Sequence, residues 1–293
     1  MQRLENLFMN HYKKIIIIPI LLLVFSLVVF VIQAQKGSIL TKDISLQGGT
    51  SVTITSEQGV NIDELQESLE NSFPNSDILV RELADVTTGK KIGILIEATN
   101  IKNEELQPFL EKHFETKFTS DSYSVEEIGA SLSASFFKEL RLAMIFSFLF
   151  MSIVVFITFR KIVPSLTVIL TALTDILVTL AIVSIMHLRI STAGIAAFLL
   201  LIGYSIDTDI LLTTKVLKRT ESSLFARIYS SMKTGLTMTI TAIAAVTVGL
   251  FSNSVVLQQI FTIILIGLIV DVISTYLGNA PALIWYCKKK NIQ

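Results

Sequence analysis

Four carboxylates stand in stretches of the sequence that are otherwise apolar enough to cross a membrane. Each costs roughly 2.5–3.5 kcal/mol near the middle of a membrane helix. Because apolar surroundings favour the neutral form of a carboxyl group, such residues are suited to bind and release a proton or another cation. Static hydrogen bonds that hold helices together are the structural alternative. The four residues are Asp175, Asp207, Asp209 and Asp271.

Two of these residues, Asp207 and Asp209, point roughly 200° apart on a helix with 3.6 residues per turn. Gly203 lies one turn from Asp207 on the same face and permits close helix contact. We therefore expect Asp207 to face the helix bundle and Asp209 to lie nearer to water. On this assignment, replacing Asp207 impairs function more than replacing Asp209. Lys233 is a possible counter-charge for Asp207, although a role as an interfacial anchor explains it equally well.

The elements that must position these groups are membrane helices. Of the 293 residues, 52% are hydrophobic and 16% are charged, and several apolar runs approach the length that spans a bilayer. Asp175, Asp207 and Asp271 each fall near the middle of such a run, so they could form one polar layer. The six predicted spans are Lys14–Gln33, Leu142–Phe159, Val163–Met186, Ala193–Thr213, Thr234–Phe251 and Val256–Trp285.

Lysines and arginines in the short flanks predict the orientation in the membrane. Thirteen of them lie on one side, whereas the two short loops on the other side contain only Arg189. Basic flanks favour the cytoplasm, so we expect both termini inside a cell membrane. The first apolar run is too long for a usual signal peptide, and no typical cleavage site follows it, so we interpret it as a retained anchor.

Residues 35–141 are polar and predict a folded domain on the outer side, between an anchor (residues 1–34) and the helices of residues 142–293. Alternating and amphipathic patterns in this segment indicate strand, helix, strand, strand, helix, strand. The expected fold class is a bundle of six transmembrane helices with an α+β, ferredoxin-like outer domain between helices 1 and 2. The glycine pair Gly48–Gly49 predicts a tight structural turn rather than a phosphate-binding loop.

Several kinds of chemistry are not expected. His11, His113 and His187 are scattered and Cys287 is the lone cysteine, so the sequence predicts no metal site, disulfide or cofactor. An intramembrane aspartyl protease needs two aspartates that share a proton, and the glycine-x-glycine-aspartate motif of that class is absent. We therefore do not expect an enzyme.

Three segments of the sequence resemble those of a known family. The longest segment, Leu173–Arg219, reads "LTDILVTLAIVSIMHLRISTAGIAAFLLLIGYSIDTDILLTTKVLKR". The other two are "MKTGLTMT" at Met232–Thr239 and "DISLQGGT" at Asp43–Thr50. Together they resemble the SecD/SecF family of protein-export membrane proteins, over nearly the whole chain. The resemblance implies a relative of the resistance-nodulation-division transporters that assists Sec-dependent export. Implied partners are a SecD-like membrane protein, the Sec translocon channel, unfolded exported polypeptides and the lipid bilayer, without nucleic acid.

The same resemblance implies a relay driven by a proton or ion gradient, with Asp207, Asp209, Lys233, Asp175 and Asp271 as its candidate residues. Bacterial members usually read G-Y-S-x-N-D-[ST] where this chain has "GYSIDTD", so their acidic position falls on a threonine between two aspartates. This departure resembles the archaeal branch of the family. Either Asp207 or Asp209 could then have the proton-relay role. Lys233 matches a basic position that is usually arginine. A passive scaffold or chaperone for emerging chains is the alternative without a relay.

Overall fold

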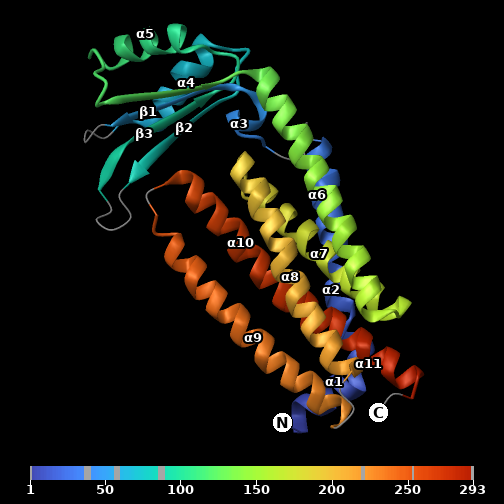
Figure 1. The fold of residues 1–293 in the computed structure, drawn as a ribbon. Coiled ribbons are helices and arrows are strands. Elements are labelled where there is room, and N and C mark those ends of the chain that lie inside the picture. The colour runs from blue at the N-terminus through green and yellow to red at the C-terminus, as the bar shows by residue number, and fades with distance from the viewer. Residues whose placement is uncertain are drawn as a thin grey trace.

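The structure is a computed structural model that describes residues 2–35, 41–55, 60–84, 90–218, 222–252 and 254–291. A bundle of long helices forms most of the molecule, and a small sheet with two helices lies across one end of it (Figure 1). Both ends of the chain lie at the opposite end of the bundle (Figure 1).

The described residues contain six helical stretches that are long and apolar enough to cross a membrane, which confirms the six predicted spans. The first stretch, Phe8–Gln35, runs from the second half of α1 (Gln2–Ile15) through α2 (Ile17–Gln35). Helix α6 (Ala130–Phe159) begins well before the apolar run that predicted it. The last stretch is a helix with a π-helical segment inside it. The remaining helices are α7 (Ile162–Ile185), α8 (Thr192–Lys218), α9 (Leu224–Gly249), α10 (Val255–Ser274), η1 (Thr275–Asn279) and α11 (Ala280–Lys289).

The sheet domain, which we define as the described residues between 41 and 128, has one antiparallel sheet in the order β2-β3-β1-β4. Helices α4 and α5 cover the face of the sheet that is turned away from the bundle (Figure 1). Alternation places apolar side chains of the strands against these helices, and Val52, Leu65 and Leu106 are fully buried there. The elements are β1 (Gly49–Thr55), α4 (Ile62–Ser72), β2 (Ile78–Ala84), β3 (Lys91–Ala98), α5 (Asn103–His113) and β4 (Tyr123–Ile128).

The glycine pair ends the short helix α3 (Ile44–Gln47) and begins β1, and both glycines have positive φ angles, 84° at Gly48 and 149° at Gly49. A Cβ atom on Gly48 would lie 2.5 Å from the backbone of Ala130, at the start of α6. The tight turn predicted from the sequence is therefore confirmed, and it lets the sheet domain approach the first turn of α6 closely.

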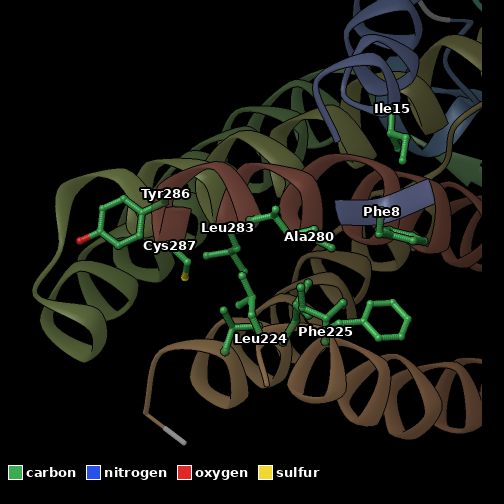
Figure 2. Packing of buried hydrophobic residues seen from close by; sticks show 12 residues of the cluster. Phe8, Ile15, Leu224, Phe225, Ala280, Leu283, Tyr286 and Cys287 are labelled. Atoms are coloured by element: carbon green, nitrogen blue, oxygen red, sulfur yellow. The ribbon is translucent and has the colours of Figure 1, made fainter. Parts of the chain in front are cut away.

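At the other end of the bundle, α1 packs across α11 and the start of α9. Phe8 and Ile15 of α1, Phe225 of α9 and Leu283 of α11 belong to one buried apolar cluster (Figure 2). Cys287 is fully buried in the same cluster, so its role there is packing.

Candidate functional site

Three of the four membrane aspartates meet inside the bundle. Asp175 of α7 and Asp209 of α8 are 0% exposed, and Asp271 of α10 is 1% exposed. Side-chain hydroxyl and amide groups from the same helices and from η1 surround them. We call these three residues and their polar neighbours the aspartate cluster.

Asp175 accepts hydrogen bonds from two serines on two different helices. The Ser205 hydroxyl of α8 donates to Oδ2 at 2.5 Å, and the Ser274 hydroxyl at the end of α10 donates to Oδ1. Ser274 also lies 3.3 Å from the backbone carbonyl of Asp271. Asp175 thus ties α7 to both α8 and α10 in the middle of the bundle.

Asp209 has three polar partners, one on α7 and two on η1. The Thr171 hydroxyl lies 2.5 Å from Oδ2, while the Thr275 hydroxyl and the Asn279 amide nitrogen lie 3.0 Å and 2.8 Å from Oδ1. Asn279 also lies 3.4 Å from the hydroxyl of Thr213. Every carboxylate oxygen of Asp209 is therefore satisfied without a basic residue.

Asp271 completes the cluster, because it shares the hydroxyl of Thr275 with Asp209. The distance from Thr275 Oγ1 to Asp271 Oδ1 is 3.2 Å. Thr208 of α8 approaches the other oxygen of Asp271 at 3.0 Å. One hydroxyl thus bridges two buried carboxyl groups on neighbouring helices.

The last helix contains a π-helical segment where it contacts Asp209 and Asp271. A π-helix widens the turn and shifts the faces of the residues that follow, and such segments are often found at functional sites. Thr275 begins this segment and Asn279 ends it. Both side chains point into the cluster, although they lie on a helix whose next turns, from Ala280 onward, pack elsewhere.

The orientation predicted for Asp207 is wrong. Its side chain is exposed on the surface of this chain, and a Cβ atom on Gly203 would meet nothing within 4 Å. The face of α8 that packs against α7 and α10 instead contains Leu201, Ser205 and Asp209. Asp207 lies about 160° from Ser205 around the helix. Because the face with Ser205 packs inside the bundle, the side chain of Asp207 points outward.

Asp207 lines a groove of about 390 Å³ between α8, α9 and α10. Asp271 and Thr208 line the same groove, together with Tyr204 and Met238. The groove therefore joins the exposed Asp207 to the aspartate cluster through Asp271.

Lys233 is exposed on α9, and no ion pair joins it to an aspartate among the described residues. Within the described part of the chain, the ion pairs join Lys91 to Glu82 and Arg189 to Asp77, and both involve the sheet domain. The counter-charge role of Lys233 therefore stays a prediction.

Sequence reasoning missed the hydroxyl and amide groups that complete the cluster. Thr171 stands one helical turn before Asp175, and Thr275 stands one turn after Asp271, so their spacing was visible. Hydroxyl residues are frequent in membrane helices and often bond to their own backbone, so the signal was weak. The missed residues are Thr171, Ser205, Thr208, Thr213, Ser274, Thr275 and Asn279.

The chemistry available to the cluster follows from its charges. Three carboxyl groups lie together, and among the described residues no ion pair joins them to a basic side chain. Isolated ionised groups are too costly to keep in such a place. At least some of them must be neutralised by protons or by a bound cation. Among the described residues, no His, Cys, Asp and Glu side chains form a group arranged to hold a metal ion.

This chain is similar to known membrane proteins of protein export. The family model described as "Protein export membrane protein SecD/SecF, C-terminal" matches residues 109–289. A protein-export membrane protein SecF from Methanocaldococcus jannaschii is 38% identical over 288 residues, which cover 94% of this chain and 96% of that protein. The corresponding protein of Methanothermobacter thermautotrophicus is 34% identical, with 97% of this chain and 95% of that protein covered.

Two solved structures share the fold. The crystal structure of SecDF, a translocon-associated membrane protein from Thermus thermophilus, matches with a TM-score of 0.73 and 19% identity, over 96% of this chain and 38% of that one. SecDF in a super-membrane-facing form matches with a TM-score of 0.57 and 21% identity, over 97% of this chain and 39% of that one. This chain therefore spans well under half the length of the SecDF chains.

Proposed function

The chain belongs to the SecD/SecF family of protein-export membrane proteins, and we propose that it acts with a SecD-like partner to promote movement of unfolded polypeptides through the Sec channel. It is a multi-pass membrane protein with six apolar helices among its described residues. Its likeness over nearly the full length of SecF relatives supports the role of a SecF-type subunit. The coupling of export to an ion gradient is the finer part of the proposal.

The observation that carries the coupling is the Thr275 bridge between Asp209 and Asp271. A threonine hydroxyl has a single proton to donate, yet Thr275 contacts a carboxyl oxygen of each aspartate, at 3.0 Å and 3.2 Å. Either the hydroxyl shares this proton between two carboxylates, or one carboxyl group is protonated and donates to the hydroxyl, and the second arrangement avoids two adjacent negative charges in the bundle. The geometry therefore favours a bound proton and offers a route for its transfer between the two carboxyl groups.

The groove at Asp207 gives this proposed relay an entrance. Its exposed carboxyl group lies at the surface, and Asp271 lines the same groove from inside the bundle. A cation attracted by Asp207 would meet Asp271 first and Asp209 next, through Thr275. On this route Asp207 attracts the ion and the buried pair binds it.

Polar residues in and around this groove support the proposed partner. Asp207, Lys233, Thr237 and Thr241 are exposed within helices that span the membrane, where lipid contact is unfavourable for charged and polar groups. A second set of helices lying against α8 and α9 would cover them. Because the SecDF chains are more than twice as long as this one, a SecD-like bundle is the partner that we propose for this surface.

We also propose the sidedness that the basic flanks predict, with both termini in the cytoplasm. The sheet domain and the loop that contains Arg189 lie at the same end of the bundle, opposite to the termini (Figure 1). This arrangement supports an outer domain within residues 35–141. Its element order and its sheet order support placement in the ferredoxin-like class, which alone specifies no function.

An export assay in membrane vesicles tests the coupling. The chain is produced with its SecD-like partner, and entry of a substrate polypeptide is measured with the ion gradient present and collapsed. Asp209→Asn keeps the size and the hydrogen-bonding oxygen of the side chain but cannot titrate, so we expect it to abolish the gradient-dependent increase. Asp207→Asn, on the same helix but outside the cluster, should reduce this increase less.

A passive scaffold or chaperone gives a different result. In that case, wild type and Asp209→Asn would support the same export, and collapsing the gradient would not change the contribution of either. Equal membrane levels of the variants, measured by immunoblotting, are required for the comparison.

A further inference from the structure

The sheet domain is attached to the bundle by hydrogen bonds between two backbone segments. The amide of Asp43 donates to the carbonyl of Ile190 at 3.0 Å, and the amide of Ile190 donates to the carbonyl of Thr41 at 2.8 Å. The amide of Thr192 donates to the hydroxyl of Ser45 at 3.1 Å. Residues 41–45 are the start of the sheet domain, before β1, while residues 186–191 join α7 to α8 and Thr192 begins α8, so these bonds hold the domain in its docked position.

Glu97 lies beside this attachment. It is on β3, on the face of the sheet turned toward the bundle, and it is 8% exposed. It lines a cavity of about 560 Å³ between the sheet and the nearby ends of α8 and α10. Its Oε2 atom is buried and has no hydrogen-bond partner, which is unusual for a carboxylate oxygen.

Charged groups from three elements surround Glu97. Asp43 approaches from the start of the sheet domain, Arg81 from β2 and Arg189 from the α7–α8 loop. Arg189 is also buried, and its Nη2 atom lies 2.9 Å from Asp77, while its Nη1 atom has no hydrogen-bond partner. Two further titratable side chains stand near this interface but are exposed: Glu126 on β4, which lines the same cavity, and His187 on the loop.

We propose that Glu97 is a protonation-controlled latch that holds the sheet domain on the ends of the membrane helices. When Glu97 is neutral, it can stay buried next to Asp43 at the attachment. When it ionises, the carboxylates of Glu97 and Asp43 repel each other, and Arg81 and Arg189 offset part of this repulsion. Opening of the interface then hydrates Glu97 and separates it from Asp43. This proposal does not depend on the proposed ion relay.

The direction of the pH effect follows from the pKa of Glu97. Burial, and then the charge of Asp43, raise the pKa of Glu97 from 4.5 to about 7, while Arg81 and Arg189 act in the opposite direction. After opening, the pKa should return toward its ordinary value. The docked state therefore binds the proton more tightly, and its advantage is complete below pH 4.5 and is lost as the pH rises through 7.

The size of the effect follows from the same two values. If the pKa is about 7 when docked and 4.5 when open, the ratio of docked to open molecules falls by at most about 70-fold between pH 5 and pH 8. Nearly all of this change lies below pH 7. An acid medium on the side of the sheet domain thus favours the docked state.

Hydrogen exchange of the attachment amides measures this equilibrium, even when open molecules are rare. The full chain is placed in lipid nanodiscs, and exchange is followed by mass spectrometry in peptides that cover Asp43, Ile190 and Thr192, with correction for the intrinsic pH dependence. In the wild type we expect protection to fall by up to about 70-fold from pH 5 to pH 8. In Glu97→Gln, protection should not depend on pH.

Three further variants separate the latch from other titrating groups. Asp43→Asn keeps a side chain that can cap α3 but removes the neighbouring charge, so it should shift the transition to lower pH. Glu126→Gln and His187→Asn should both behave like the wild type, and asparagine tolerates the positive φ of 52° at position 187. A wild-type protein without pH-dependent protection, or a Glu97→Gln variant with the wild-type response, would overturn the proposal.

Discussion

Replacing the bridging hydroxyl tests whether the aspartate cluster stabilises the bundle and transmits protons. Thr275→Val keeps the shape of the side chain but removes its contacts with Asp209 at 3.0 Å and Asp271 at 3.2 Å. Asp209 keeps Thr171 and Asn279, and Asp271 keeps Thr208, so neither carboxyl group is left without a partner.

The magnitude follows from the two lost contacts. Hydrogen bonds between membrane helices contribute about 0.6 kcal/mol on average and up to about 1.7 kcal/mol. Two such bonds give about 1–3 kcal/mol, and we expect the free energy of unfolding to fall by this amount. The measurement is unfolding of the purified chain in mixed micelles with increasing denaturing detergent. Gradient-dependent export should also fall, because the route between the two carboxyl groups is broken.

Thr179→Val is the matched control. Thr179 is 0% exposed on α7, but its hydroxyl has no hydrogen-bond partner. The same substitution there removes a buried polar atom that is unsatisfied, so it should leave stability unchanged or raise it. Equal stability and equal export in the two valine variants would refute the reasoning.

Two other predictions test the junction and the sidedness. Gly49→Ala should destabilise the protein by about 1–3 kcal/mol, because φ is 149° and the added Cβ would lie 2.3 Å from the carbonyl oxygen of Ala98. Gly203→Ala, with nothing within 4 Å, should have little effect, and thermal unfolding of both variants decides the matter. In a Cys287→Ala background, a cysteine at Glu70 on α4 should react with an impermeant reagent added outside cells, whereas one at Ser222 should react only after the membrane is opened. The reverse labelling would overturn the proposed orientation. Gly89, where the sequence suggests the same label, lies outside the described residues.

The sequence predicted the helices of the bundle better than the directions in which they face. Length and hydropathy are sufficient to find a span, since lipid and the bundle interior both select apolar residues. For the same reason, α8 has apolar residues on nearly all sides, and its pattern does not show which face is buried. Gly203 suggested the wrong face, because a glycine permits a close contact but does not require one.

The connections within the cluster could not be predicted for a different reason. The contact between Asn279 and Asp209 depends on the π-helical segment, which begins at Thr275 and changes the register of the residues that follow by a fraction of a turn. No residue type in "TYLGN" specifies such a segment. The sequence therefore predicted that aspartates meet within the membrane helices. It placed Asp207 with Asp175 and Asp271, whereas the structure places Asp209 there.

Helix α10 runs from the loop that holds the sheet domain to the aspartate cluster. Near its start, Gln259 bonds to the backbone of Arg189 and to Ser191, in the loop that holds the sheet domain. Near its end, Asp271 belongs to the aspartate cluster. From Ile263 to Val270 the helix is apolar, and Ile263 and Ile264 pack with Leu201 in a buried apolar cluster. An influence of the sheet domain on the aspartates would therefore pass through displacement of helices rather than through proton transfer along α10. It can act on α10 through Gln259, and on α7 and α8 because the loop joins them. A close-packed core transmits such displacements well, and Gly267 packs so tightly on Leu201 that an added Cβ would lie 2.4 Å from it.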